Sequence, residues 1–198
     1  MATGTKVLGV SGSMRERSHS RRALGLVLEA CRAHGAETRL LELRTLELPV
    51  YRPDRHFDEP AVREAAEAVR WADAIVIATP DYHGSMSGAV KNFLDYHWRE
   101  FTGKLFGYVV ASHEKGLTVM DQLRTAVRQC YGWSLPYGVS THGAEDFDPA
   151  TGAITNAKLA GRLRMLGRDV VVYGQLLRGQ FDRDVAEKAT DTFAAYVG

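Results

Sequence analysis

The chain has 198 residues, of which 45% are hydrophobic and 25% charged, and its 25 Lys and Arg residues nearly balance its 24 Asp and Glu residues. This length and composition predict one globular domain over residues 1–198 and exclude a disordered chain. A formal net charge of +1 gives no electrostatic reason to expect nucleic acid or an anionic membrane surface as a partner.

The sequence predicts no membrane-spanning helix, since no apolar run approaches the roughly 20 residues that such a helix needs. The polar start MATGTK is followed by an apolar segment too short for a signal peptide. We therefore expect a cytoplasmic protein. Cys31 and Cys130 form no CxxC pair and fall on apolar helix faces, so buried reduced thiols are favoured over a disulfide or a metal site.

Short apolar runs alternate with helical spacing along the chain, which is the pattern of an α/β fold on a parallel sheet. Runs rich in Val, Ile or Leu predict strands at 7–10, 40–43, 74–78 and 108–111, with a weaker fifth at 133–139. Apolar residues at helical spacing predict helices over 24–31, 62–69, 90–97, 120–130, 159–177 and 182–196.

Five such strands joined by right-handed crossovers favour a doubly wound five-stranded parallel sheet with helices on both faces. The flavodoxin-like strand order 2-1-3-4-5 is the simplest candidate. Ligands bind such a sheet at the carboxyl ends of its strands. The loops 11–20, 80–88 and 112–117 should therefore converge there.

The first of these loops suits a phosphate, because it leads into a helix whose N-terminus offers unpaired N–H groups and a positive dipole end. Arginine side chains add charge-assisted hydrogen bonds. The candidate donors are Ser11, Ser13, Ser18 and Ser20 with Arg15, Arg17, Arg21 and Arg22. The alternative is that Ser18 is only an N-cap and the arginines are solvated surface. No GxGxxG follows the first strand and no P-loop is present, which disfavours dinucleotide or nucleoside triphosphate cradles.

Two motifs in combination carry a family resemblance. The first loop has the pattern Gly-Ser-x-Arg-x-x-Ser at Gly12, Ser13, Arg15 and Ser18. The second has Pro80, Tyr82, Gly84, Ser85, Gly88, Lys91, Asn92, Leu94 and Asp95. Over roughly residues 5–140 the chain resembles the NADPH-dependent FMN reductase family. The resemblance implies non-covalent FMN, with NADPH or NADH as electron donor.

The same resemblance assigns the cofactor contacts by position. It implies Ser13, Arg15, Ser18 and Ser20 at the phosphate, Pro80, Asp81, Tyr82, His83, Gly84 and Ser85 along the flavin ring, and Ser112, His113 and Gly116 at its pyrimidine edge. Tyr82 would supply an aromatic wall, although an ordinary loop aromatic is the alternative. Lys91, Asn92 and Asp95 would order their helix and a subunit contact.

Three positions depart from the family pattern. Ser20 and His83 stand where asparagine is common, and the third loop reads SHEKGLT in place of a glycine-rich turn. Lys115 or the next helix N-terminus could face the anionic reduced flavin. A solvated Glu114–Lys115 pair is the alternative.

The resemblance implies a reductase that passes a nicotinamide hydride to FMN and then electrons to a small acceptor by a ping-pong mechanism. The acceptor classes are free flavin, a quinone, an azo compound or a metal oxyanion. No catalytic side chain is expected, because the cofactor carries the chemistry. No metal site is expected either, because the seven histidines form no HxH or HExxH arrangement.

The region after the fifth strand has two interpretations. Residues 141–155 read as a loop that covers the flavin edge of its own or a neighbouring subunit. Residues 142–198 hold this loop and the C-terminal helices, whose apolar surface suggests the interface of a homodimer or homotetramer, with intrachain packing as the alternative. Two other functions stay open: a flavodoxin-type electron carrier without its own NAD(P)H oxidation, and a flavin-free regulatory relative.

Overall fold

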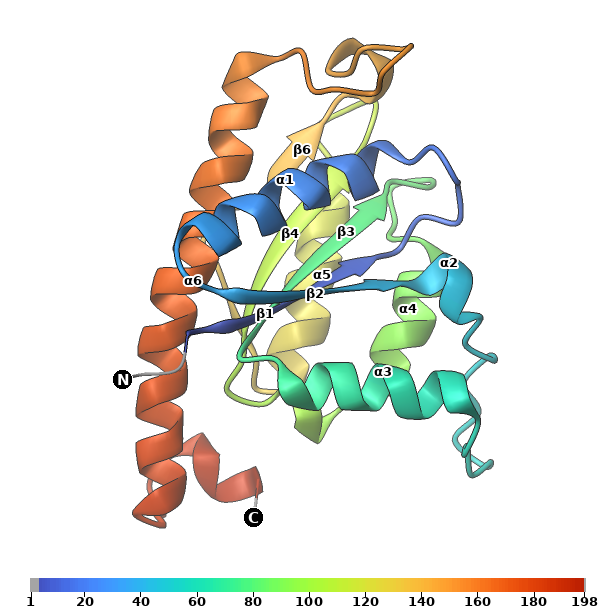
Figure 1. The fold of residues 1–198 in the computed structure, drawn as a ribbon. Helices are drawn as coiled ribbons and strands as arrows, with labels where there is room; N and C mark the ends of the chain where they lie inside the picture. Colours follow the sequence, from blue (N-terminus) through green and yellow to red (C-terminus); the bar gives the residue numbers. More distant parts are fainter. Residues whose placement is uncertain (1–3, 198) are drawn as a thin grey trace.

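A parallel sheet forms the centre of the protein, as seen in a computed structural model that describes residues 4–197. Its strands are β1 (Lys6–Ser11), β2 (Glu37–Glu42), β3 (Ala74–Pro80), β4 (Leu105–Ala111), β5 (Trp133–Ser134) and β6 (Val139–Thr141). The order is β2-β1-β3-β4-β5, and β6 pairs with β4 as well (Figure 1). The predicted flavodoxin-like topology is therefore confirmed.

The fifth strand position is divided between two short segments. β5 pairs with Leu105 and Phe106 at the start of β4, whereas β6 pairs with Val109 to Ala111 at its end. Between them lies Pro136, which has no N–H to donate to a ladder. The second strand was also misplaced in part, because β2 begins at Glu37 and Leu43 opens the short helix α2 (Leu43–Leu46).

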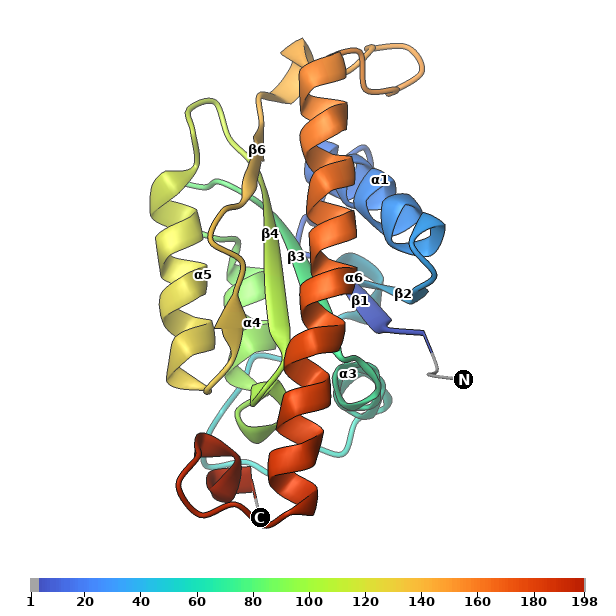
Figure 2. The same ribbon diagram turned by 90° about the vertical axis from the view of Figure 1, so that its left-hand side faces the viewer.

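Helices cover both faces of the sheet. They are α1 (His19–Ala33), α3 (Pro60–Trp71), α4 (Gly88–Asp95), α5 (Leu117–Gln129) and α6 (Ala157–Ala186), with 3-10 turns η1 (Arg99–Phe101), η2 (Gly143–Glu145) and η3 (Phe193–Val197). One core cluster joins the sheet to α3, α4 and α5, and the other joins it to α1 and α6. Figure 2 shows the sheet between α4 and α5 on one side and α1 and α6 on the other. The central strands β1, β3 and β4 are apolar on both faces for this reason, whereas the edge strand β2 is largely polar and exposed.

The predicted separate helix over 182–196 is wrong. α6 continues through Asp182 to Ala186, where side-chain pairs one turn apart join Arg178 to Asp182 and Gln180 to Asp184. The chain leaves the helix at Lys188, whose φ of 52° is left-handed. Only η3 remains of the predicted terminal helix, and Phe193 there packs on Phe181 with ring centroids 5.8 Å apart.

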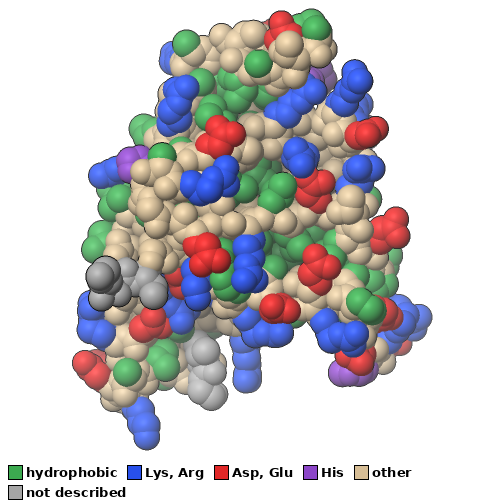
Figure 3. All heavy atoms as spheres, in the orientation of Figure 1, with side chains coloured by type: hydrophobic (Ala, Val, Ile, Leu, Met, Phe, Trp, Pro, Cys, Tyr) green, Lys and Arg blue, Asp and Glu red, His purple; other side chains and the backbone are tan. Residues whose placement is uncertain are grey.

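Surface and thiol features agree with the expectations in part. Lys and Arg side chains are interspersed with Asp and Glu over the face in Figure 3. In the described part of the chain, no helix is long and apolar enough to cross a membrane. Both cysteines are free. Cys31 is buried, which raises the pKa of its thiol to about 12, whereas Cys130 is only partly buried.

Candidate functional site

A cavity of about 330 Å³ lies where the loops after β1, β3 and β4 meet, at the carboxyl edge of the sheet. A fourth segment, after β6, completes its wall. The lining residues are Ser13, Arg15, Arg17, Ser18, His19, Ser20, Pro80, Asp81, Tyr82, His83, Ala111, Ser112, His113 and Gly143. The predicted convergence of the three loops therefore occurs.

The first loop is held close to the second by backbone and hydroxyl contacts. The Gly12 N–H donates to the Ala78 carbonyl at 2.8 Å, and the Ser87 hydroxyl donates to the Gly12 carbonyl at 2.6 Å. A Cβ on Gly12 would lie 2.0 Å from Val90 Cγ2, so only glycine allows this approach to α4. Gly12 thus sets the position of the loop without lining the cavity.

Hydroxyl groups gather where this loop enters α1. Ser18 is the N-cap, and its Oγ accepts the Arg21 N–H at 3.2 Å and shares a 3.0 Å hydrogen bond with Ser20 Oγ. Ser13 Oγ accepts the Arg15 N–H at 3.2 Å. The first turn of α1 contains no acidic residue. Ser18 therefore caps the helix and lines the cavity as well, so the two interpretations of this residue are compatible.

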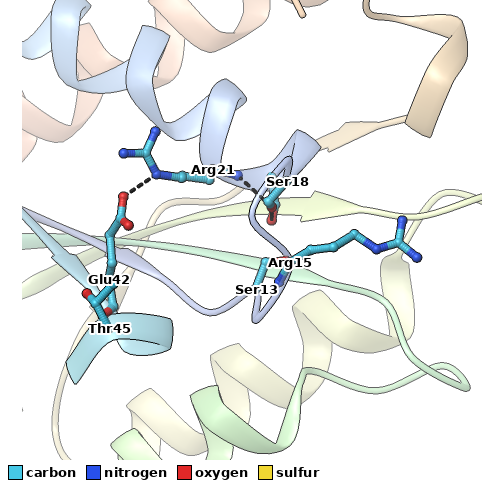
Figure 4. Close-up of polar contacts among 7 residues, drawn as sticks. Ser13, Arg15, Ser18, Arg21, Glu42 and Thr45 are labelled. Atoms are coloured by element: carbon cyan, nitrogen blue, oxygen red, sulfur yellow. Dashed lines mark hydrogen bonds and ion pairs between the residues drawn. The ribbon is translucent and has the colours of Figure 1, made fainter. Parts of the chain in front are cut away.

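The four arginines of this segment separate into two groups. Arg21 pairs with Glu42, and Arg15 extends in the opposite direction, as Figure 4 shows. Arg22 lies against the turn at Gly152, where a Cβ would stand 2.0 Å from the Arg22 Cζ. Arg15 and Arg17 line the cavity and form no ion pair with any residue that the structure describes. Arg22 also has no ion pair among the described residues, but only Arg15 and Arg17 combine an unpaired guanidinium group with a place in the cavity wall.

The second loop is a tight hairpin turn. Tyr82 and Ser85 exchange backbone hydrogen bonds of 2.9 and 3.1 Å, and the two central residues have positive φ, 57° at His83 and 74° at Gly84. This is the pattern of a type I′ turn, in which asparagine and glycine are the usual central residues. The His83 N–H has no partner among residues 4–197, whereas the N–H groups of Asp81, Tyr82, Gly84 and Ser85 are all bonded. Tyr82 stands beside the turn with 47% of its surface exposed.

Asp81 connects the second loop to the third. One carboxylate oxygen accepts the Gly84 N–H at 2.8 Å and the other accepts the Ser112 hydroxyl at 2.8 Å. Ser112 is also tied to β6, because its N–H donates to the Thr141 carbonyl at 3.0 Å. The Asp81 side chain is therefore already bonded on both oxygens. It holds the cavity wall together.

A second cavity of about 810 Å³ adjoins the first and shares Asp81, Ser112 and His113 with it. Lys115, Gly116 and the start of α5 line its far side. Glu114 and Lys115 are both exposed, as the solvated alternative expects, but they form no ion pair with each other in the described structure. Gly116 has a φ of 60° and leads into α5 without a side-chain cap.

The cavity contains most of the predicted cofactor residues. Four predicted residues do not line it: Gly84 and Gly116 face the second cavity, Ser11 is buried in β1, and Ser85 bonds to Gln122 of α5 at 2.8 Å. Sequence reasoning missed His19, Ala111 and Gly143, and did not include Arg17 among the cofactor residues. The sequence position of His19 could have identified it as a residue of the cavity wall, because it directly follows Ser18 at the start of α1.

The loop after β6 covers the α1 end of this cavity within the same chain. Phe147 stacks on His19 with ring centroids 4.7 Å apart, and Asp146 accepts the His142 N–H at 2.6 Å and the Asn156 amide at 2.7 Å. Burial lowers the pKa of His19, and the nearby Arg22 and Arg15 lower it further, while Asp146 opposes the shift. His19 is thus a neutral aromatic contact at neutral pH.

Residues of α4 act at a distance from the cavity. Lys91 pairs with Asp95 at 2.6 Å one turn further along the helix. Asn92 accepts the Tyr51 N–H at 2.8 Å and donates to the Pro49 carbonyl at 2.9 Å. The predicted ordering of this helix agrees with these contacts, and Asn92 additionally fixes the loop that follows α2.

The donor set fits a phosphate at one end and a flat ring at the other. Hydroxyls and the guanidinium groups of Arg15 and Arg17, which have no carboxylate partner among the described residues, lie just before and at the start of α1. Tyr82 and the His83 N–H, which has no partner in the same part of the chain, lie on the turn after β3. This site on a doubly wound sheet defines a flavodoxin-like nucleotide-binding protein. The profile of the NADPH-dependent FMN reductase family matches residues 5–146. The chain belongs to this family.

Curated relatives agree with the family. An NAD(P)H-dependent FMN reductase of Pseudomonas aeruginosa is 36% identical over 114 residues, which cover 52% of this chain. The match covers 58% of that protein, which is less than two thirds of its length. An NADPH azoreductase of Bacillus sp. is 30% identical over 142 residues, 70% of this chain and 77% of that one. The predicted resemblance is thereby confirmed, and with it an oxidoreductase that uses FMN and a nicotinamide donor.

Solved structures share the fold. The flavoenzyme NAD(P)H:acceptor oxidoreductase of Paracoccus denitrificans has a TM-score of 0.73 at 22% identity, covering 87% of this chain and 98% of that one. A WrbA-like flavodoxin of Agrobacterium tumefaciens has a TM-score of 0.62 at 17% identity, covering 87% and 98%. At these identities the likeness concerns the fold alone.

Proposed function

We propose that the protein is an FMN-dependent NAD(P)H reductase that delivers electrons to a small-molecule acceptor in a ping-pong sequence. The observation that carries this proposal is the cavity itself, in which anion-binding groups and an aromatic-walled turn face one space. When bound, FMN supplies the hydride-accepting and electron-donating chemistry, so the chain needs no nucleophile or general base of its own.

The first loop binds the phosphate in this proposal. Ser13, Ser18 and Ser20 offer hydroxyl donors, and Arg15 offers a guanidinium group whose charge is not already neutralised by a carboxylate. The α1 N-terminus adds the favourable end of the helix dipole. Each charge-assisted hydrogen bond to the phosphate contributes on the order of 1.5–3 kcal/mol.

The second and third loops orient the ring. The His83 N–H is the one donor of the turn without a protein partner in the described chain, so it is the group we assign to the ring edge. Tyr82 forms a wall against the flat cofactor. Asp81 acts indirectly, because its bonds to Gly84 and Ser112 keep both loops at a fixed separation.

Donor and acceptor use one exposed side of the site in turn. The second cavity opens directly from the first and offers Lys115 and His113 as polar contacts. If donor and acceptor occupy the same space beside the ring in turn, the oxidised nucleotide has to leave before the acceptor enters, which gives ping-pong kinetics. Initial rates at several fixed NADPH concentrations should give parallel double-reciprocal lines, and intersecting lines would contradict this order.

The acceptor belongs to the small, flat, reducible compounds in this proposal. Relatives are named as an FMN reductase and an azoreductase, which supports free flavin and azo compounds ahead of the other classes. Comparing kcat/KM for FMN, an azo dye, a quinone and a metal oxyanion in one buffer ranks them directly.

The first experiment is an anaerobic visible spectrum of the FMN-reconstituted protein before and after addition of NADPH or NADH. Bleaching of bound flavin by either nucleotide is the expected result, and the faster donor identifies the preferred one. Bound flavin that stays oxidised with both would refute the reductase and leave a carrier. Failure to retain FMN would refute the cofactor assignment.

A matched pair of arginine variants tests the phosphate assignment. Arg15→Ala should weaken FMN binding by about tenfold or more, because a charge-assisted bond is lost, without lowering the thermal midpoint. Arg21→Ala is the control, since Arg21 is paired with Glu42 and points away from Arg15 (Figure 4). Equal FMN affinity of the two variants, measured by calorimetry, would remove Arg15 from the site.

A further inference from the structure

A group of aromatic side chains lies at the end of the molecule opposite the cofactor cavity. Tyr131 and Trp133 stand where the chain passes from α5 into β5, and each is 46% exposed. Phe193 and Tyr196 of η3 lie against them. In Figure 2 the end of α5 and η3 are at the bottom, whereas β6 and the loop after β4 are at the top. These aromatic residues therefore do not belong to the cofactor site.

The rings form two walls that meet at an angle. The Tyr131 ring is inclined by only 4° to the Phe193 ring and by 10° to the Tyr196 ring, with centroids 6.2 and 5.6 Å away. The Trp133 ring stands at 66° to the Phe193 ring, with centroids 6.1 Å apart. Aromatic rings attract one another when they are offset and parallel or when they meet edge to face. A flat aromatic molecule in this corner can make both kinds of contact.

A groove of about 430 Å³ opens beside these rings. Small-molecule sites have volumes of roughly 300–1,000 Å³, so the groove suits a compound smaller than a dinucleotide. None of its lining residues is acidic. They are Arg124, Arg128, Tyr131, Gly132, Trp133, Ser134, Leu135 and Phe193.

The two arginines of α5 make this groove positive. Arg128 is exposed and forms no ion pair with any residue that the structure describes. Arg124 bonds to Asp121 at 3.0 Å, which neutralises part of its charge. The hydroxyls of Ser134 and Tyr108 share a 2.6 Å hydrogen bond and so satisfy each other. Arg128 therefore offers an uncompensated charge and a planar set of N–H donors, which suit an oxyanion such as a carboxylate.

Backbone contacts hold the aromatic residues in place at the groove. The Trp133 N–H donates to the Lys104 carbonyl at 2.8 Å, and the Tyr131 carbonyl accepts the Gly103 N–H at 3.0 Å. Tyr131 follows Cys130, the C-cap of α5, and has a φ of 56°. Glycine or asparagine is usual at this left-handed position, and a bulky residue is strained there. Helix termination does not explain a tyrosine at this position, whereas ring stacking beside the groove does.

We propose that this groove is a second ligand site, specific for a small planar aromatic molecule that bears an acidic group. The aromatic ring stacks in the corner formed by Tyr131, Trp133 and Phe193, and the acidic group pairs with Arg128. Phe193 lies beyond residues 5–146, which the family profile matches, so the family's cofactor motifs do not account for the groove. A single-stranded nucleic acid would also combine stacking with arginine, but a formal net charge of +1 gives little attraction for a polyanion.

Titration of the full chain with naphthoate tests the site, followed by the indole N–H signals of its three tryptophans in ¹H–¹⁵N spectra. The Trp133 signal, identified by its absence from Trp133→Leu, should shift with a Kd of about 0.1–1 mM. The signals of Trp71 and Trp98 should stay in place, although Trp98 is 66% exposed. Naphthamide has the same shape without the charge, and it should bind about tenfold more weakly, because the charge-assisted contact to Arg128 is lost.

A matched pair of arginine variants locates the acidic group of the ligand. Arg128→Gln should raise the Kd for naphthoate about tenfold, and it should fold as the parent does, because Arg128 is exposed and has no ion pair in the described chain. Arg15→Ala is the control, since Arg15 lines the cofactor cavity and should leave this Kd unchanged. An unshifted Trp133 signal, equal Kd values for naphthoate and naphthamide, or weaker binding in Arg15→Ala but not in Arg128→Gln would overturn the proposal.

Discussion

A buried histidine makes the stability of the fold depend on pH. His97 is 3% exposed, and neither ring nitrogen has a hydrogen-bond partner among the described residues. Its ring stands edge-on to Phe93 and Phe101, with centroids 4.8 and 5.4 Å away. Burial lowers the pKa of His97 to about 4, while Glu100 opposes the shift and Arg70 adds to it. The fold therefore holds the neutral imidazole.

The direction in which pH changes the stability follows from proton binding to His97. An unfolded histidine has a pKa of about 6.5. Below that pH the unfolded chain binds a proton at this position, whereas the folded chain does not bind it until the pH approaches 4. The stabilisation from the neutral ring is complete above pH 6.5 and is lost as the pH falls toward 4. Between pH 7 and pH 4.5 the loss is about 2.5 kcal/mol for this one group. That is a large part of the 5–15 kcal/mol typical of a domain.

The test compares urea unfolding of the parent and of His97→Leu at several pH values from 7.5 to 4.5, with all other titrating groups in common. The difference in unfolding free energy between the two proteins should shift by about 2.5 kcal/mol in favour of the leucine variant as the pH falls. His56→Gln, at an exposed position, controls for the loss of an imidazole as such. Parallel stability curves for the parent and His97→Leu would refute the reasoning.

Three further substitutions test the loops of the site. Gly12→Ala should destabilise the protein by about 1–3 kcal/mol in urea unfolding, because its Cβ would overlap the Val90 side chain, and it should weaken FMN binding; unchanged values would show that the loop can move. Ser112→Ala removes one partner of the Asp81 carboxylate and should cost roughly 1–3 kcal/mol, with faster FMN release in stopped-flow displacement; an unchanged release rate would deny the loop connection a role. His83→Gly should raise the thermal midpoint by relieving a left-handed non-glycine residue, worth about 0.5–1 kcal/mol, and a lower midpoint would contradict that view.

The parallel sheet was predictable because each central strand is apolar on both faces, and such strands occur in parallel sheets covered by helices. The strand order followed as the simplest doubly wound arrangement with right-handed crossovers. Val7 and Leu8 illustrate this, since they are both fully buried and belong to different core clusters. The parallel direction then places all loops of one kind at one edge. For that reason Ser18, Tyr82 and Ser112 could be grouped from the sequence although they lie far apart in it.

Contacts between the loops could not be predicted in the same way. The Asp81–Ser112 hydrogen bond joins residues 31 positions apart, and no local pattern distinguishes a bonded carboxylate from one that faces a ligand. The end of the α6 helix was missed for a related reason. Apolar spacing weakens after Leu177, but side-chain pairs such as Arg178–Asp182 carry the helix onward without an apolar stripe.

The arginines of the first loop show what the sequence predicts and what only the fold decides. The sequence has four arginines next to a helix N-terminus, and from the sequence alone their guanidinium groups are equivalent donors. Glu42 at the end of β2 forms an ion pair with Arg21, and the turn at Gly152 packs against the guanidinium group of Arg22. Both partners reach the loop only through the fold. The parallel pairing of β1 with β2 and the return of the chain over α1 thereby leave Arg15 and Arg17 without a carboxylate partner among the described residues, at the end of the cavity where we propose that the phosphate binds.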